Sequence, residues 1–63
     1  MNELKRRREL AKLTQQQLAD KSDVNLVTLQ KYENGTNDIK RARVDIVLKL
    51  SKALGTTIEE LII

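Results

Sequence analysis

The chain has 63 residues, of which 40% are hydrophobic, and its formal net charge is +3. Because it contains neither Cys nor His, disulfide bonds, thiolate zinc sites and imidazole catalysis are excluded. No apolar run approaches the roughly 18 residues of a membrane span, and the first residues do not begin a secretory signal, so we expect a cytoplasmic protein. With two Gly and no Pro, the composition favours one all-α domain over residues 1–63.

The positive charge lies on either side of a nearly neutral middle segment. Residues 1–12 carry five Lys or Arg and two Glu, and residues 37–54 carry five Lys or Arg and two Asp. Residues 13–36, between them, carry two Lys and three acidic residues. This distribution is typical of a protein that contacts phosphates with its flanks and reads bases between them. Ordinary solvated helix faces are the alternative explanation.

Residues 2–12 are predicted to form the first helix, because Leu4 and Ala11 lie seven residues apart and share one face. Arg8 lies between them on that face, and a buried Arg needs a partner. Arg8 either pairs with Glu33 or extends its charged end to solvent. Arg6 and Arg7 are expected to be surface charges.

The second helix is predicted to open just after Thr14, because Thr14 and Gln17 form a capping-box pattern. The polar run at residues 20–23 is the expected turn after this helix. Gln15, in the first helical turn, can present its amide and the nearby backbone N–H groups to a phosphate. Alternatively, it simply occupies an exposed position.

A third helix is predicted from Asn25, a good N-cap, to Asn34, where Gly35 can take positive φ. At about 100° per residue, Leu29 defines an inward side that also includes Asn25, Tyr32 and Glu33. The outward-facing stripe comprises Val27, Lys31 and Asn34, with Leu26, Thr28 and Gln30 on its flanks.

These outward residues have the side-chain types that read base edges in a major groove. Val27 contacts either a thymine methyl group or a protein partner. Lys31 donates either to a guanine edge or to a phosphate, and Leu26 is either half-buried or in contact with DNA.

Residues 36–43 connect to a fourth helix, in which apolar residues recur at helical spacing from Ile39 to Leu54 before Gly55 ends it. Lys40, Arg41 and Arg43 either meet phosphates beside the third helix or are free surface charges.

Thr57 is predicted to start a last short helix, with Glu60 completing a second capping box. The terminal Leu61, Ile62 and Ile63 cannot all face one small core, so we expect them to form a two-fold homodimer interface. A frayed apolar end is the alternative.

Residues 13–35 resemble the DNA-binding core of the Cro and lambda-repressor family, also called the xenobiotic-response-element-like family. The residues that carry the resemblance are Leu13, Thr14, Gln15, Leu18, Ala19, Val24, Thr28, Leu29, Glu33 and Gly35, with Leu4, Arg8, Ala11, residues 50–55, Glu60 and Leu61 outside this core. The family resemblance implies a compact five-helix domain, with helices 2 and 3 as the helix-turn-helix. It also implies an Arg8–Glu33 ion pair and a Gln15 that anchors the unit on the DNA backbone.

The sequence departs from the family pattern at several positions, among them Arg7, where many members have Leu. Lys12 and Asp23 stand where Gly is frequent, and Ser22 stands where family members usually bury an apolar side chain. These departures predict a lower stability without a change of fold.

The expected function is a sequence-specific double-stranded DNA-binding transcriptional regulator, a repressor of prokaryotic or phage type that occupies a palindromic operator. The alternative is an antitoxin or another protein-interaction module on the same fold. No catalysis, cofactor, metal, small-molecule ligand or membrane partner is expected. The residues expected to contact DNA are Gln15, Asn25, Leu26, Val27, Thr28, Gln30, Lys31, Asn34, Lys40, Arg41 and Arg43.

Overall fold

Five α-helices and one short 3-10 turn make up residues 2–62, the part of the chain that the computed structural model describes. The elements are α1 (Glu3–Leu10), α2 (Gln15–Ser22), α3 (Leu26–Glu33), η1 (Ile39–Arg41), α4 (Val44–Leu54) and α5 (Ile58–Ile62). No strand occurs within this range. The prediction of an all-α, five-helix fold is confirmed.

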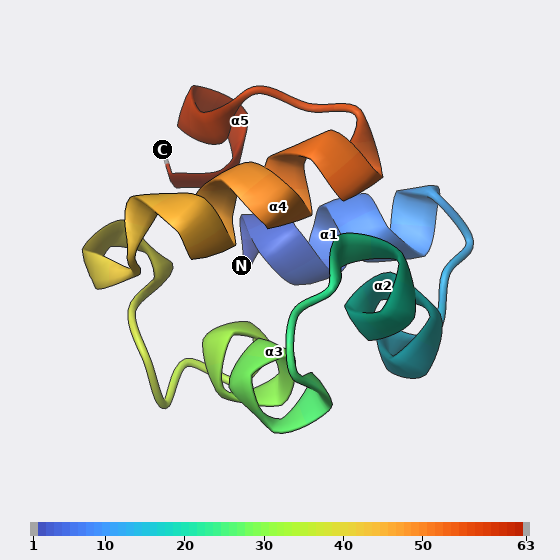
Figure 1. Cartoon of the computed structure of the whole chain (residues 1–63), viewed down its shortest axis with the longest axis horizontal. Helices are drawn as coiled ribbons and strands as arrows, with labels where there is room; N and C mark the ends of the chain where they lie inside the picture. The colour runs from blue at the N-terminus through green and yellow to red at the C-terminus, as the bar shows by residue number, and fades with distance from the viewer. Residues whose placement is uncertain (1, 63) are drawn as a thin grey trace.

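The helices are arranged around α4, which crosses the middle of the molecule (Figure 1). α4 packs against α2 and α5, while α3 packs against α2 and α1. α3 lies at the edge of the molecule opposite α5 in this view (Figure 1). One face of α3 is therefore available to solvent.

A single cluster of apolar side chains from all five α-helices forms the core. Its buried members are Leu4, Leu18, Ala19, Val24, Leu29, Val47, Leu50, Ala53 and Leu61. Each fully buried Leu contributes roughly 1.5–3 kcal/mol relative to an exposed one. Because Leu29 is among them, the inner face of α3 is held against the rest of the molecule.

The first helix is shorter than residues 2–12. Asn2 is its N-cap, where the side-chain oxygen accepts from the backbone N–H of Lys5, and Ala11 is its C-cap. Lys12 then takes a left-handed conformation with φ 60°. Residues that carry a Cβ adopt this conformation at a cost, which Gly avoids.

The capping box at Thr14 and Gln17 is confirmed, with both reciprocal hydrogen bonds present. The helix continues to Ser22, so most of the expected turn at residues 20–23 is helical. The buried Ser22 Oγ donates to the carbonyl oxygen of Leu18 at 2.6 Å, which satisfies the hydroxyl within its own helix. The turn is made at Asp23, with φ 58°.

The fourth helix begins later than the apolar spacing predicts. Ile39 belongs to a 3-10 turn capped by Asp38, and Ala42 is extended with ψ 154°, so α4 starts only at Val44. Ile39 and Ala42 still pack against the core. Their spacing therefore reports burial correctly, although the backbone between them is not α-helical.

The last helix is capped as predicted, because the Thr57 backbone N–H donates to Glu60 and the Glu60 N–H donates to Thr57. Leu61 was expected at a dimer interface, but it is only 2% exposed and lies in the core. Ile62 is half-buried. Ile63, the third residue expected at a dimer interface, lies outside the described residues.

Candidate nucleic-acid interface

The third helix is fixed at both ends by asparagines. The side-chain oxygen of Asn25 accepts from the backbone N–H groups of Val27 and Thr28, at 2.8 and 3.4 Å. Asn25 is exposed, not inward-facing, because the chain leaves the helical path at the N-cap. Asn34 is the C-cap, and its side-chain oxygen accepts from the Thr36 backbone N–H at 2.8 Å.

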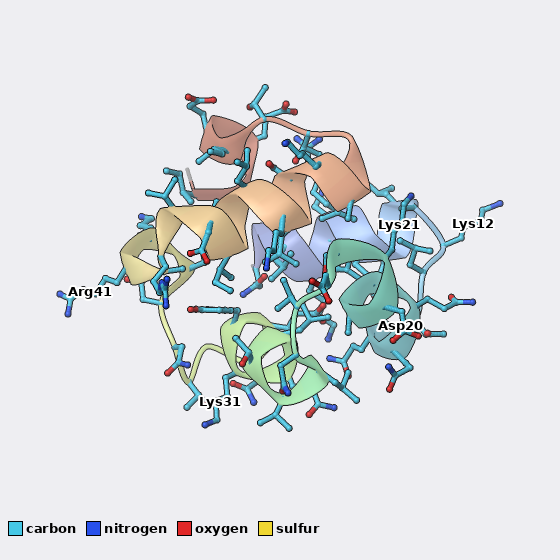
Figure 2. The ribbon with its side chains drawn as sticks, in the orientation of Figure 1. Lys12, Asp20, Lys21, Lys31 and Arg41 are labelled. Atoms are coloured by element: carbon cyan, nitrogen blue, oxygen red, sulfur yellow. The ribbon has the colours of Figure 1, made fainter. Side chains whose placement is uncertain are left out.

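The two sides of α3 differ as its periodicity predicts. Leu29 and Glu33 are buried and Tyr32 is half-buried, whereas Val27 is 55% exposed and Lys31 is also exposed. Lys31 extends away from α3 at the edge of the molecule (Figure 2). The flanking residues Leu26, Thr28 and Gln30 are half-buried, and Leu26 packs against the core. α3 thus presents a narrow exposed stripe on a rigidly held helix.

The turn between α2 and α3 sets how the two helices meet. Asp23 donates its backbone N–H to the Asp20 carbonyl, and Val24 donates to the Ala19 carbonyl at 3.1 Å. Val24 is buried beneath this turn. The arrangement of two short helices around a capped, anchored turn is that of a helix-turn-helix unit.

Arg8 and Glu33 form a bidentate ion pair between α1 and α3. Arg8 Nε lies 2.7 Å from Glu33 Oε2, and Arg8 Nη2 lies 3.0 Å from Oε1. The side chains are 11% and 2% exposed. Arg8 Nη1 also donates to the Leu13 carbonyl at 2.8 Å. The hydrogen bonds to Glu33 raise the pKa of Arg8 further above its ordinary value, so the guanidinium stays charged.

Gln15 does not point freely outward as the phosphate-contact interpretation requires. It is half-buried, and its Nε2 donates to Glu33 Oε1 at 3.2 Å. Gln30 Nε2 donates in turn to Gln15 Oε1 at 3.4 Å. The first turn of α2 is therefore connected to α3 by a chain of side-chain hydrogen bonds.

The flanking positive charge is distributed unevenly in the structure. On α1, Arg6 and Arg7 pair with Glu3 at 2.8 and 3.1 Å, and Arg7 also pairs with Glu60 at 2.9 Å. With Arg8 paired as well, much of the charge at residues 1–12 is neutralised internally.

At the other flank, Lys40 and Arg41 are exposed on η1. Figure 2 shows Arg41 directed away from the body of the molecule. Arg43 lies 3.3 Å from Asp45 in a largely exposed pair, which adds little stability. The cations of η1 are thus exposed to solvent and available to an external anion.

Lys5 is a candidate contact that the sequence interpretation missed. It is exposed and lines a shallow groove with Gln15, Glu33 and Asn34, beside the C-terminal end of α3. A signal for it exists in the sequence, since Lys5 and Arg8 lie three residues apart on one face of α1. Once Arg8 is paired with Glu33, Lys5 must lie near the same end of α3.

None of the helices within residues 2–62 has the length and apolar character that crossing a bilayer requires. A family model described as helix-turn-helix matches residues 4–61, from α1 to α5. Comparison with curated proteins and with solved structures found no match.

Proposed function

The chain belongs to the helix-turn-helix family of DNA-binding domains of Cro and lambda-repressor type, and from this premise we propose that it is a sequence-specific repressor of transcription. It binds double-stranded DNA through the exposed side of α3 and excludes other proteins by occupying its operator. The observation that carries the proposal is the exposed pair Val27 and Lys31, four residues apart on a helix whose opposite side is buried.

In this proposal α3 lies in the major groove, which is wide enough to admit one α-helix. Val27 contacts the methyl group of a thymine, and Lys31 donates to the O6 and N7 acceptors of a guanine. Thr28 and Gln30, on the flanks of the stripe, contact neighbouring base edges. Asn25 and Asn34, at the two ends of α3, lie closer to the backbone of the DNA, and Leu26 contributes mainly packing.

The phosphate contacts come from both ends of this surface. Lys40, Arg41 and Arg43 supply charge beside α3 from η1 and the start of α4, and Lys5 supplies charge beside Gln15. Contacts of this kind release counterions, so affinity falls steeply as salt is raised. They fix the position of α3 in the groove and carry no sequence information themselves.

Two copies acting together read a palindromic operator, with half-sites about 34–36 Å apart. The proposed dimer surface is a mainly apolar groove of about 140 Å³ at one edge of the molecule. It is lined by Ile39, Ala42, Val44, Val47, Ile58 and Ile62, with Lys40 as its one charged member. Val44 is 74% exposed at its margin. This surface replaces the one expected from Leu61, while Ile62 remains part of it.

Selection of bound duplexes from a random pool tests the proposal. The expected result is enrichment of one sequence with two-fold symmetry, bound less tightly as salt is raised. Failure to enrich any duplex at low salt would overturn the proposal and favour a protein-interaction module of the antitoxin kind, for which the exposed Val44 and Leu48 offer a binding surface.

A further inference from the structure

Four side chains form a continuous hydrogen-bonded chain from the interior to the flank of the exposed stripe. Arg8 donates twice to Glu33, Gln15 Nε2 donates to Glu33 Oε1, and Gln30 Nε2 donates to Gln15 Oε1. The order of donors and acceptors along this chain is not arbitrary. It starts at the Glu33 carboxylate, which accepts two hydrogen bonds from the Arg8 guanidinium.

The carboxylate determines which way each amide faces. An ionised carboxylate only accepts hydrogen bonds, so Gln15 must turn its NH₂ group toward Glu33 and its oxygen away. That oxygen also only accepts, so Gln30 must turn its own NH₂ group toward Gln15. The oxygen of Gln30 is therefore directed away from Gln15.

We propose that Glu33 and Gln15 are positioning residues that fix the orientation of the Gln30 amide and thereby make Gln30 a reader of adenine. The proposal rests on the proposed function, because it assumes that α3 lies in a major groove. One N–H of Gln30 is engaged by Gln15, which leaves its oxygen and a second N–H for a base. Adenine presents the matching pair, with N6–H as donor and N7 as acceptor.

Guanine is the informative competitor. Its edge presents two acceptors, O6 and N7, so the outward oxygen of Gln30 faces an acceptor instead of a donor. A freely rotating glutamine would relieve this repulsion by turning its NH₂ group outward. The fixed amide cannot do so without breaking the chain to Glu33, so the chain should raise discrimination between adenine and guanine.

The test uses duplex selection followed by binding measurements on duplexes that differ only at the position read by Gln30. Gln30→Ala identifies that position as the one where the adenine preference disappears. The expected preference of the parent for adenine over guanine is about 5- to 140-fold, as for a good bidentate contact. Gln15→Met, which keeps the side-chain length but removes the amide, should lower this ratio several-fold while other positions are read as before.

Gln16→Met is the matched control, because Gln16 is also on α2 but donates to Asp20 at 2.9 Å on the exposed side of that helix. Its adenine-to-guanine ratio should equal that of the parent, and thermal melts should show that all variants are folded. An unchanged ratio in Gln15→Met, or a Gln30→Ala variant that reads every position like the parent, would overturn this inference while leaving DNA binding intact. A parent that enriches no duplex would instead reject the proposed function.

Discussion

The two sides of α3 have the same backbone but opposite surroundings. On the inner side, Leu29 lies in the core and Glu33 accepts hydrogen bonds from Arg8 and Gln15. On the outer side, Val27 and Lys31 are exposed to solvent. The inner side fixes where the helix lies, and the outer side is free to meet a partner.

This difference implies that the two sides tolerate substitution in different ways. A change on the inner side removes contacts that the folded state needs and lowers the free energy of unfolding. A change on the outer side leaves the folded state nearly unaltered, because surface substitutions usually shift stability by no more than about 0.5 kcal/mol. The variants described below test whether the two sides of α3 are separate in this sense.

The largest effect is expected from Glu33→Ala. The substitution leaves the Arg8 side chain, which is only 11% exposed, without its counter-charge. Breaking a buried pair in this way costs about 3–5 kcal/mol. Chemical denaturation followed by circular dichroism measures the loss. A matched double variant, Arg8→Met with Glu33→Leu, should recover most of it, because apolar replacements of a buried pair are often neutral or stabilising. An unchanged midpoint in Glu33→Ala would show that the pair contributes nothing to the fold.

Lys31→Ala should give the reverse pattern on the outer side. The thermal melt should match the parent, while discrimination at one base pair of each half-site should fall by about 1–3 kcal/mol. Val27→Ala should alter preference at a neighbouring position. Competition binding with duplexes carrying single base changes measures both effects. A loss of stability in Lys31→Ala without a change of sequence preference would contradict the assignment of the outer side to base contacts.

Arg41→Ala tests whether the DNA-binding surface extends from the outer side of α3 onto η1. Removing a phosphate contact should weaken binding to all duplexes about equally and reduce the salt slope by about one. Lys49→Ala is a suitable control, because Lys49 is an exposed cation in the middle of α4 and should leave the slope unchanged. A selective loss for one sequence would show that Arg41 reads bases instead.

How far the sequence predicts this molecule depends on the kind of signal. Capping at Thr14 and Thr57 is local, since each box involves residues three apart, and both were predicted correctly. The burial of Leu29 follows from helical periodicity alone. The start of α4 was placed too early because Ile39 and Ala42 have helical spacing, although they are buried through a 3-10 turn and an extended residue.

The candidate site required information that no local pattern contains. The hydrogen bond from Gln15 to Glu33 joins residues 18 positions apart, and only the packing of α2 against α3 brings them together. The burial of Leu61 likewise depends on how α5 docks. By contrast, helical periodicity placed both Arg8 and Glu33 on inward faces and left two outcomes open for Arg8. The family resemblance selected the pairing, because it carries long-range information that periodicity lacks.

A smaller change in the free energy of unfolding is expected from the turn between α1 and α2. This turn leads into α2, which packs against α3. Lys12 has φ 60°, and relieving the strain of a left-handed residue gains about 1–2 kcal/mol. Gly also makes the unfolded chain more flexible, which offsets about 0.4–1 kcal/mol. Lys12→Gly should therefore raise the free energy of unfolding by up to about 1.6 kcal/mol. Ala11→Gly, at φ −79°, should lower it, and a stabilised Ala11→Gly variant would contradict the explanation.

The smallest effect comes from a contact outside both sides of α3, where α1 meets α5. Hydrogen bonding to Arg7 lowers the pKa of Glu3 from its ordinary value of 4.5. The hydrogen bond from the Thr57 backbone N–H lowers the pKa of Glu60 from the same value, and Arg7 contributes further. Because the lowered values belong to the folded state, the stabilisation is complete above about pH 4.5 and is lost as the pH falls through them.

Melting temperatures measured from pH 6 to pH 3 should therefore decline at the acidic end of this range, and less so in high salt because both carboxylates are exposed. Glu60→Gln keeps a side-chain acceptor for the Thr57 N–H but does not titrate, so its decline should be shallower. Combination with Glu3→Gln should flatten the curve further. If the double variant lost stability in acid as steeply as the parent, the contact between α1 and α5 would not be the source of the acid sensitivity.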